Sequence, residues 1–191
     1  MLARDFAGVL SAAASGDELA FARLWRDVHP ALLRYLRVLT KDETVAEDVA
    51  AEVWVDVTRR LGSFTGDESA FRGWLFTLAR RRAIDAWRAA QRARVHLTGD
   101  DADLDRAGGL DTAGSALERM TTQQALALIA TLPMDQAEAI TLRVIAGLDV
   151  KDVARLLGKR PGAVRVAAHR GLRTLAARLS APHPRHPAQR R

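Results

Sequence analysis

One acidic, glycine-rich segment, residues 96–115, constrains the fold of this chain more than any other feature. It holds four glycines and five aspartates, and it interrupts the three- and four-residue spacing of apolar side chains found on either side. That spacing is typical of amphipathic helices, and the alternation expected of strands is absent. A segment of this composition is typical of a flexible linker. The sequence therefore predicts an all-α protein with two small helical domains joined by a flexible acidic linker.

The part before the linker is predicted to form a bundle of three long helices. Pro30 should kink or restart the first helix, and Thr44 and Glu47 have the spacing of a capping box at the start of the second. Three helices of this length can close one small bundle. We expect an N-terminal extension over residues 1–17 and an N-terminal helical bundle over 18–95, with helices at about 17–39, 44–61 and 70–94.

The part after the linker carries the pattern of a helix-turn-helix. Asp149 can cap the first helix of this motif, with Asp152 completing a capping box, and Gly158 supplies a tight turn. Pro161 suits the first turn of the second helix. The buried side of that second helix is expected to consist of Val164, Ala168, Leu172 and Leu175.

The opposite face of the second helix is basic. In a helix-turn-helix the second helix enters the major groove of DNA, where arginine can read guanine and hold phosphates. An ordinary helical hairpin with exposed arginines is the alternative. We expect this domain over residues 116–179 and a basic tail over 180–191. The DNA-binding candidates are Arg160, Arg165, His169, Arg170 and Arg173.

The net charge of +6 is distributed unevenly along the chain. Residues 72–94 hold seven arginines against one aspartate, and residues 151–178 hold eight basic residues against one aspartate. Two compact basic segments indicate two surfaces for polyanions such as nucleic acid, although a solvated helix face is the alternative for either segment alone. All ten aromatic residues fall before residue 88, which indicates two domains with different roles.

Several classes of protein are excluded by residue content. The chain has no cysteine, which rules out disulfides, thiolate zinc sites, iron–sulfur clusters and a cysteine nucleophile. Its five histidines lack metal-binding spacing, and no phosphate-binding glycine loop or G-x-S-x-G motif occurs. We therefore predict no catalytic residue, no metal, no cofactor and no enzymatic activity. No apolar run approaches the roughly 20 residues that span a bilayer. Because the N-terminus also lacks the pattern of a signal peptide, we expect a cytoplasmic protein without membrane insertion.

Four motifs occur in an order that resembles one protein family. They are AFARLWRDVHPALLRYL at 20–36, AEDVAAEVWVDV at 46–57, LGSFTGDESAFRGWLFTLARRRAIDAWR at 61–88, and the helix-turn-helix. Together they resemble the extracytoplasmic-function (group 4) branch of the bacterial sigma-70 family, over about residues 18–95 and 116–178. The resemblance implies that 18–95 is sigma region 2, which binds core RNA polymerase and recognises and melts the minus-ten promoter element. It implies that 116–179 is region 4, which recognises the minus-thirty-five element as duplex.

The resemblance also implies protein partners. In this family the second helix of region 2 docks on the clamp helices of core RNA polymerase. Asp48, Glu52 and Asp56 recur every four residues here and predict an acidic stripe opposite the valines, which would complement a basic partner helix. A solvated face is the alternative for this stripe. The other partners that the resemblance implies are the polymerase flap, promoter DNA and an anti-sigma factor.

In the family, the loop and helix that follow hold a flipped base and track the backbone of the separated strand. A separated strand needs a cationic groove beside aromatic or apolar walls. The spacing of Trp74 places it in the core, whereas the role of Trp87 is open. The loop candidates are Phe64, Thr65, Gly66 and Asp67, and the helix candidates are Arg80, Arg81, Arg82, Arg88 and Arg92.

The recognition helix departs from the family pattern. Relatives commonly have Thr where Ala163 stands and Ser-Arg where Val166 and Ala167 stand, so this chain lacks polar groups early in that helix. We expect phosphate contacts for most of its cations and base readout by Arg165. The alternative function is a stand-alone helix-turn-helix regulator that binds duplex DNA without polymerase. That alternative would leave the aromatic and arginine-rich first domain without a role.

Overall fold

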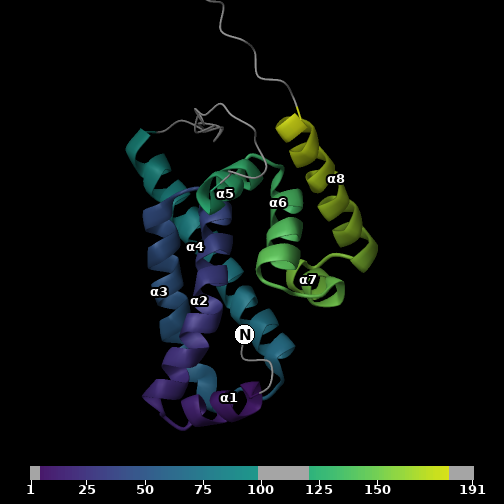
Figure 1. Cartoon of the computed structure of the whole chain (residues 1–191). Helices are drawn as coiled ribbons and strands as arrows, with labels where there is room; N and C mark the ends of the chain where they lie inside the picture. The colour runs from purple at the N-terminus through teal and green to yellow at the C-terminus, as the bar shows by residue number, and fades with distance from the viewer. Residues whose placement is uncertain (1–4, 99–120, 181–191) are drawn as a thin grey trace, which may run out of the picture.

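The computed structural model describes residues 5–98 and 121–180, and every regular element within those ranges is helical (Figure 1). Side chains are described for 5–92 and 121–180. The predicted all-α class is confirmed. Most of the predicted linker, from residue 99 on, lies outside the described residues, as do the start of the second domain at 116–120 and the basic tail from 181.

The N-terminal unit is a bundle in which three long helices lie side by side (Figure 1). Their bounds are α2 Glu18–Thr40, α3 Glu43–Arg60 and α4 Glu68–Thr98, with a short 3₁₀ turn, η1, at Leu61–Ser63. Apolar side chains at helical spacing close the core, as the sequence predicts. The core side chains include Leu24, Val28, Leu32, Tyr35, Leu36, Val53, Val57, Phe71, Leu75 and Phe76, all of which are buried.

A further helix, α1 (Phe6–Ala14), lies within the expected N-terminal extension over residues 1–17. Its buried face consists of Phe6, Val9, Leu10 and Ala13, and it packs across one end of the bundle. The ring centroids of Phe6 and Phe71 are 5.7 Å apart. The first helix is therefore part of the N-terminal core.

One local expectation in this unit is wrong. Helix α3 begins at Glu43, one residue before the proposed capping box, because the Asp42 carboxylate accepts the Val45 N–H at 3.0 Å and serves as the N-cap. Helix α2 contains Pro30 and continues without a restart. It ends at Thr40, and the next residue, Lys41, has a φ of 57° that turns the chain into α3.

Over the described residues 121–180, the C-terminal unit consists of four helices and a π-helical turn. They are α5 Thr122–Ala130, α6 Met134–Ile140, the π turn η2 at Thr141–Ile145, α7 Val150–Leu157 and α8 Pro161–Ser180. Asp149 caps α7 by accepting the Asp152 N–H at 2.7 Å, and Gly158 turns the chain with a φ of 64°. The Asp152 carboxylate does not complete the expected capping box, because it bonds to Ser69 and Arg155.

Helix α8 is rotated relative to the expected buried side. Val164, Ala167 and Gly171 are buried, whereas Leu172 is 50% exposed, which corrects its placement in the core. The reason is a close crossing of α8 over α6 at Gly171. A Cβ added there would lie 2.6 Å from Ile140 Cδ1 and would also press on Gln136. Because Gly171 has no side chain, its face of α8 can approach α6 closely, and this approach determines which side chains of α8 are buried.

This crossing gives a prediction on stability. Gly171→Ala is expected to lower the free energy of unfolding by about 1–3 kcal/mol relative to Gly162→Ala, because overpacking outweighs the gain in helix propensity. Gly162 lies on the same helix, and a Cβ added there meets nothing within 4 Å. Urea unfolding of the two variants measures the difference. Equal stabilities would contradict the close crossing.

The two units pack directly against each other. Helix α2 contacts α5, α6 and η2, and α4 contacts α7. Val38 of α2 is buried among side chains of α5, α6 and the turn between them, namely Leu126, Leu132, Ala137 and Ile140. Leu142, Leu148 and Val153 share one buried cluster with the core of the bundle. The second domain therefore lies on the face formed by α2 and α4.

Candidate nucleic-acid interface

The five candidate arginines of α4 divide into two groups. Arg81, Arg88 and Arg92 are exposed, and their separations of seven and four residues place them on one face of the helix. Arg80 and Arg82 are partly buried, and each is paired with a carboxylate of another helix. Only the first group offers open guanidinium groups in this conformation.

Arg82 binds a buried carboxylate inside the N-terminal unit. Its Nε and Nη2 donate to Asp56 Oδ2 at 2.8 and 2.6 Å, and its Nη1 reaches Glu52 Oε2 at 3.3 Å. The hydrogen bond with Asp56 raises the pKa of Arg82. The Asp56 side chain is only 7% exposed, so the predicted acidic stripe does not include it. The phase of α3 turns Asp56 toward α4 and leaves Asp48 and Glu52 exposed.

Arg80 binds a carboxylate of the other unit. Its Nε donates to Glu138 Oε1 at 2.8 Å, its Nη2 lies 3.5 Å from Oε2, and the Tyr35 hydroxyl donates to Oε1 at 3.1 Å. Glu138 is 4% exposed. Burial, followed by the charge of Glu138, raises the pKa of Tyr35 well above its ordinary value, so the phenol stays protonated as a donor. Glu138 was not a candidate in the sequence, where it is one of many helical carboxylates.

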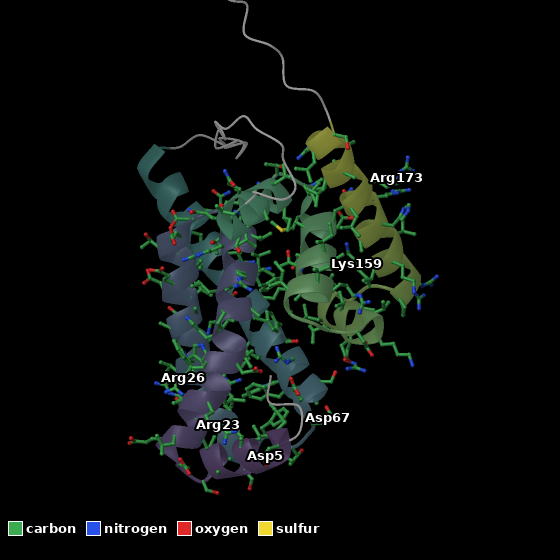
Figure 2. The ribbon with its side chains drawn as sticks, viewed as in Figure 1. Asp5, Arg23, Arg26, Asp67, Lys159 and Arg173 are labelled. Atoms are coloured by element: carbon green, nitrogen blue, oxygen red, sulfur yellow. The ribbon has the colours of Figure 1, made fainter. Side chains whose placement is uncertain are left out.

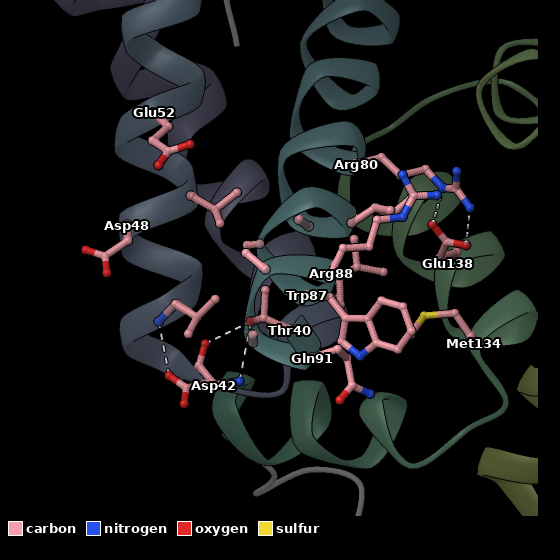
Figure 3. A pocket seen from close by; sticks show the side chains of 18 residues that line it. Thr40, Asp42, Asp48, Glu52, Arg80, Trp87, Arg88, Gln91, Met134 and Glu138 are labelled. Carbon is pink, nitrogen blue, oxygen red and sulfur yellow. Dashed lines mark hydrogen bonds and ion pairs between the residues drawn. The ribbon is translucent and has the colours of Figure 1, made fainter. Parts of the chain in front are cut away.

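Arg80 and Glu138 lie at one side of an open groove of about 780 Å³ (Figure 3). Figure 3 shows Asp48 and Glu52 on α3 at the opposite side, with Trp87 between. The sequence left the position of Trp87 open. The side chain is 57% exposed and lines the groove, so it is not a core residue. The lining side chains from α4 and α6 include Arg80, Ile84, Trp87, Arg88, Gln91, Met134 and Glu138.

The loop before α4 is held by its own side chains. The ring of Phe64 packs on Phe71 and Trp74, with centroids 5.7 and 5.1 Å away, and Trp74 packs partly buried against the core as predicted. The Asp67 carboxylate caps α4 by accepting the Ala70 N–H at 2.8 Å. Gly66 has a φ of 152°, and a Cβ there would lie 2.8 Å from that of Ala70. The exposed members of the loop are Thr65, Gly66 and Asp67.

The helix-turn-helix presents all of its candidate cations to solvent. Arg160 lies in the turn, and Arg165, His169, Arg170 and Arg173 lie along α8, all exposed. None of the five pairs with a carboxylate of the described residues. Figure 2 shows Arg173 on the outer side of α8, away from the bundle. The domain therefore carries an open cationic face of the kind that contacts phosphates.

Two other kinds of site are not found within the described ranges. No three histidine, aspartate or glutamate side chains there come together as a metal site. Across the same residues, no helix is both long enough and apolar enough to cross a membrane.

Comparison with known proteins identifies both units. Residues 24–93 match the family model of sigma-70 region 2, and residues 116–175 match that of sigma-70 region 4. The chain is 35% identical over 172 residues to the ECF RNA polymerase sigma factor ShbA of Streptomyces griseus, covering 86% of this chain and 90% of that protein. It is 31% identical over 164 residues to the ECF sigma factor BldN of Streptomyces coelicolor, covering 86% of this chain. It spans 62% of the length of BldN.

Solved structures share the fold. The sigma factor RpoE of Bartonella quintana, solved in complex with the anti-sigma factor NepR, superposes with a TM-score of 0.66 at 22% identity, covering 85% of this chain and 98% of that one. CnrH, solved in complex with the cytosolic domain of CnrY, gives a TM-score of 0.59 at 24% identity, covering 90% and 94%. By its two domain matches and its curated relatives, the chain belongs to the extracytoplasmic-function branch of the bacterial sigma-70 family.

Proposed function

We propose that this protein binds core RNA polymerase and directs it to promoters, with region 2 opening the minus-ten element and region 4 reading the minus-thirty-five duplex. Sigma factors are initiation factors and not enzymes, which agrees with the absence of catalytic motifs from the sequence. The observation that carries the proposal is a pair of open cationic faces on one chain. One face, on α4, borders a groove with an exposed tryptophan, and the other lies on a helix-turn-helix.

In region 2, the α4 face suits a separated strand. Arg81, Arg88 and Arg92 can hold successive phosphates, and Trp87 offers an aromatic wall for a base. The exposed loop residues Thr65, Gly66 and Asp67 stand before the start of α4, where a flipped base would be held. Phe64 shapes this loop from its partly buried position. Arg82 is committed to Asp56 and supports the helix from inside.

In region 4, Arg160, Arg165, His169, Arg170 and Arg173 are proposed to contact the minus-thirty-five duplex. Most of these cations would bind phosphates, since backbone contacts are the larger share of protein–DNA hydrogen bonds. Arg165 lies in the first turns of α8, the part of a recognition helix that reaches base edges. We assign base readout to Arg165.

The protein partners follow from the same proposal. Asp48 and Glu52 form the exposed acidic surface of α3 that would face the clamp helices of core polymerase, and region 4 would meet the flap. An anti-sigma factor is a further proposed partner, because RpoE of Bartonella quintana was solved with one. The proposal places the protein in the cytoplasm, where the polymerase works.

The test of this function uses promoter DNA with and without core RNA polymerase. We expect little specific binding by the protein alone, and strand opening with promoter-specific transcripts once core polymerase is added. A stand-alone regulator would instead bind duplex DNA tightly and specifically by itself. That binding, without any effect on core polymerase, would overturn the proposal.

Val166 yields a prediction on promoter sequence. It is 49% exposed on α8, next to Arg165 and one turn before His169 and Arg170. An apolar side chain in the major groove contacts the methyl group of thymine. We expect one thymine of the minus-thirty-five element whose replacement by deoxyuridine weakens holoenzyme binding about fourfold, the loss of ~0.8 kcal/mol for one methyl group.

Binding of duplexes with deoxyuridine at each thymine in turn measures this contact. Val166→Ala should remove the sensitivity to deoxyuridine. Val144→Ala is the matched control, because Val144 is also exposed in region 4 but lies on η2, off the recognition helix. Undiminished sensitivity in Val166→Ala would assign the methyl contact elsewhere.

A further inference from the structure

Region 4 covers one side of the region 2 groove, and the buried carboxylate of Glu138 lies at that contact. Glu138 of α6 binds Arg80 and Tyr35, which belong to region 2, and Met134 of the same helix lines the groove beside it (Figure 3). We propose that Glu138 is a latch that holds the free protein closed, standing at Arg80 where a phosphate of the promoter strand would bind. This inference rests on the proposed function of the groove.

The chemistry of the contact makes carboxylate and phosphate competitors. Both are oxyanions that pair with a guanidinium through parallel N–H···O bonds. The Nε and Nη2 edge of Arg80 is occupied by Glu138 in this conformation. A strand phosphate can take that edge only when Glu138 leaves it. Arg80 is therefore the one candidate of the α4 row whose use in DNA binding requires the domains to part.

Two further contacts hold the closed state. The Ser69 hydroxyl donates to Asp152 Oδ2 at 2.9 Å, which joins the start of α4 to α7 of the helix-turn-helix. Val38 is buried among apolar side chains of region 4. The closed arrangement is thus a packed interface and not a single ion pair. Once the domains part, Glu138 regains water, which removes the cost of burying its charge.

The positions of the promoter elements show why closure matters. By their names they lie about 25 base pairs apart, which is ~85 Å of duplex at ~3.4 Å per base pair. Helix α4 itself is only ~46 Å long, at ~1.5 Å per residue over its 31 residues. Helix α7 touches α4 directly in the closed state. One promoter cannot present both elements to domains in this arrangement, so engagement must open the latch.

The test measures domain separation and strand binding in the full chain. Because the protein has no cysteine, dyes can be placed at Arg59→Cys and Ala177→Cys, two exposed positions on α3 and α8, for energy transfer. A fluorescent oligo(dT) strand is the binding probe. We expect Glu138→Gln to lower energy transfer and to tighten oligo(dT) binding roughly tenfold, the fold-change for losing one charge-assisted contact.

The matched control is Asp135→Asn, which removes the same charge from α6; among the described residues, Asp135 pairs with Lys159 of region 4 and with no residue of region 2. It should behave as the unsubstituted protein. Tyr35→Phe removes one hydrogen bond from the latch without changing charge, and it should shift both readouts in the same direction by less. It serves as the second variant should Glu138→Gln fail to fold by circular dichroism.

If Glu138→Gln showed the same energy transfer and the same oligo(dT) affinity as Asp135→Asn, the proposed latch would be overturned. So would opening without a gain in affinity, because it would mean that Arg80 and the strand do not compete. Failure of the proposed function would be seen separately, as absent transcripts with core polymerase in every variant. The two failures are therefore distinguishable.

Discussion

Replacing Arg81 and Arg88 with alanine is expected to abolish promoter opening while leaving the affinity for core RNA polymerase unchanged. Both side chains are exposed on one face of α4, and Arg88 has only a long 3.8 Å pair with Asp85, itself exposed. Replacing them therefore leaves no buried carboxylate without its partner. Each removed contact with a strand phosphate should cost about 1.5–3 kcal/mol. Two such losses amount to about 10²–10⁴ in the opening equilibrium.

Permanganate reactivity of thymines in the minus-ten region measures opening, and co-elution with core polymerase measures binding. The matched control is Arg59→Ala with Arg60→Ala, which removes two exposed charges at the far end of α3. Charge reversal at Asp48 and Glu52 should produce the opposite pattern, with lost core binding. If the Arg81 and Arg88 variant lost opening and core binding to the same extent, the proposed division of labour between α3 and α4 would be wrong.

Replacing Arg82 with alanine is expected to destabilise region 2 itself. The substitution leaves the buried Asp56 carboxylate without its bidentate partner. We expect a loss of about 3 kcal/mol in the free energy of unfolding, at the low end for breaking a buried pair because Arg82 is 39% exposed. Arg81→Ala, one residue away, should be close to neutral.

Denaturant unfolding monitored by circular dichroism measures this difference. The double variant Arg82→Leu with Asp56→Leu should recover most of the stability, because it removes the buried charge along with its partner. A stability of Arg82→Ala equal to that of Arg81→Ala would mean that the pair contributes nothing. The contrast between the neighbouring arginines also explains why a triple substitution at 80–82 would mix lost DNA contacts with lost folding.

Much of the fold was predictable because helical periodicity and caps are local signals. The apolar stripes of α2, α3 and α4 and the Asp149 and Gly158 signals of the helix-turn-helix all survive in the structure. Helix α1 could also have been found, since Phe6, Val9, Leu10 and Ala13 have the same spacing. The phase of α8 could not, because it depends on how closely α6 approaches Gly171.

The candidate site was predictable as a set of residue types but not as a set of partners. Asp48, Glu52 and Asp56 look equivalent in sequence, and only the packing of α3 on α4 buries the last of them. The same packing commits Arg82 and leaves Arg81 open. The pair of Arg80 and Glu138 joins residues 58 positions apart in different domains, and periodicity carries no information on such a contact.

Transcription by core RNA polymerase on a promoter library tests the central claim most directly. Adding this protein is expected to yield transcripts from a subset of templates, and these templates should share a minus-thirty-five and a minus-ten element about 25 base pairs apart. Those transcripts should disappear with Arg81→Ala and Arg88→Ala together. Sequence-specific binding by the protein alone, with no transcript above core polymerase on any template, would contradict it.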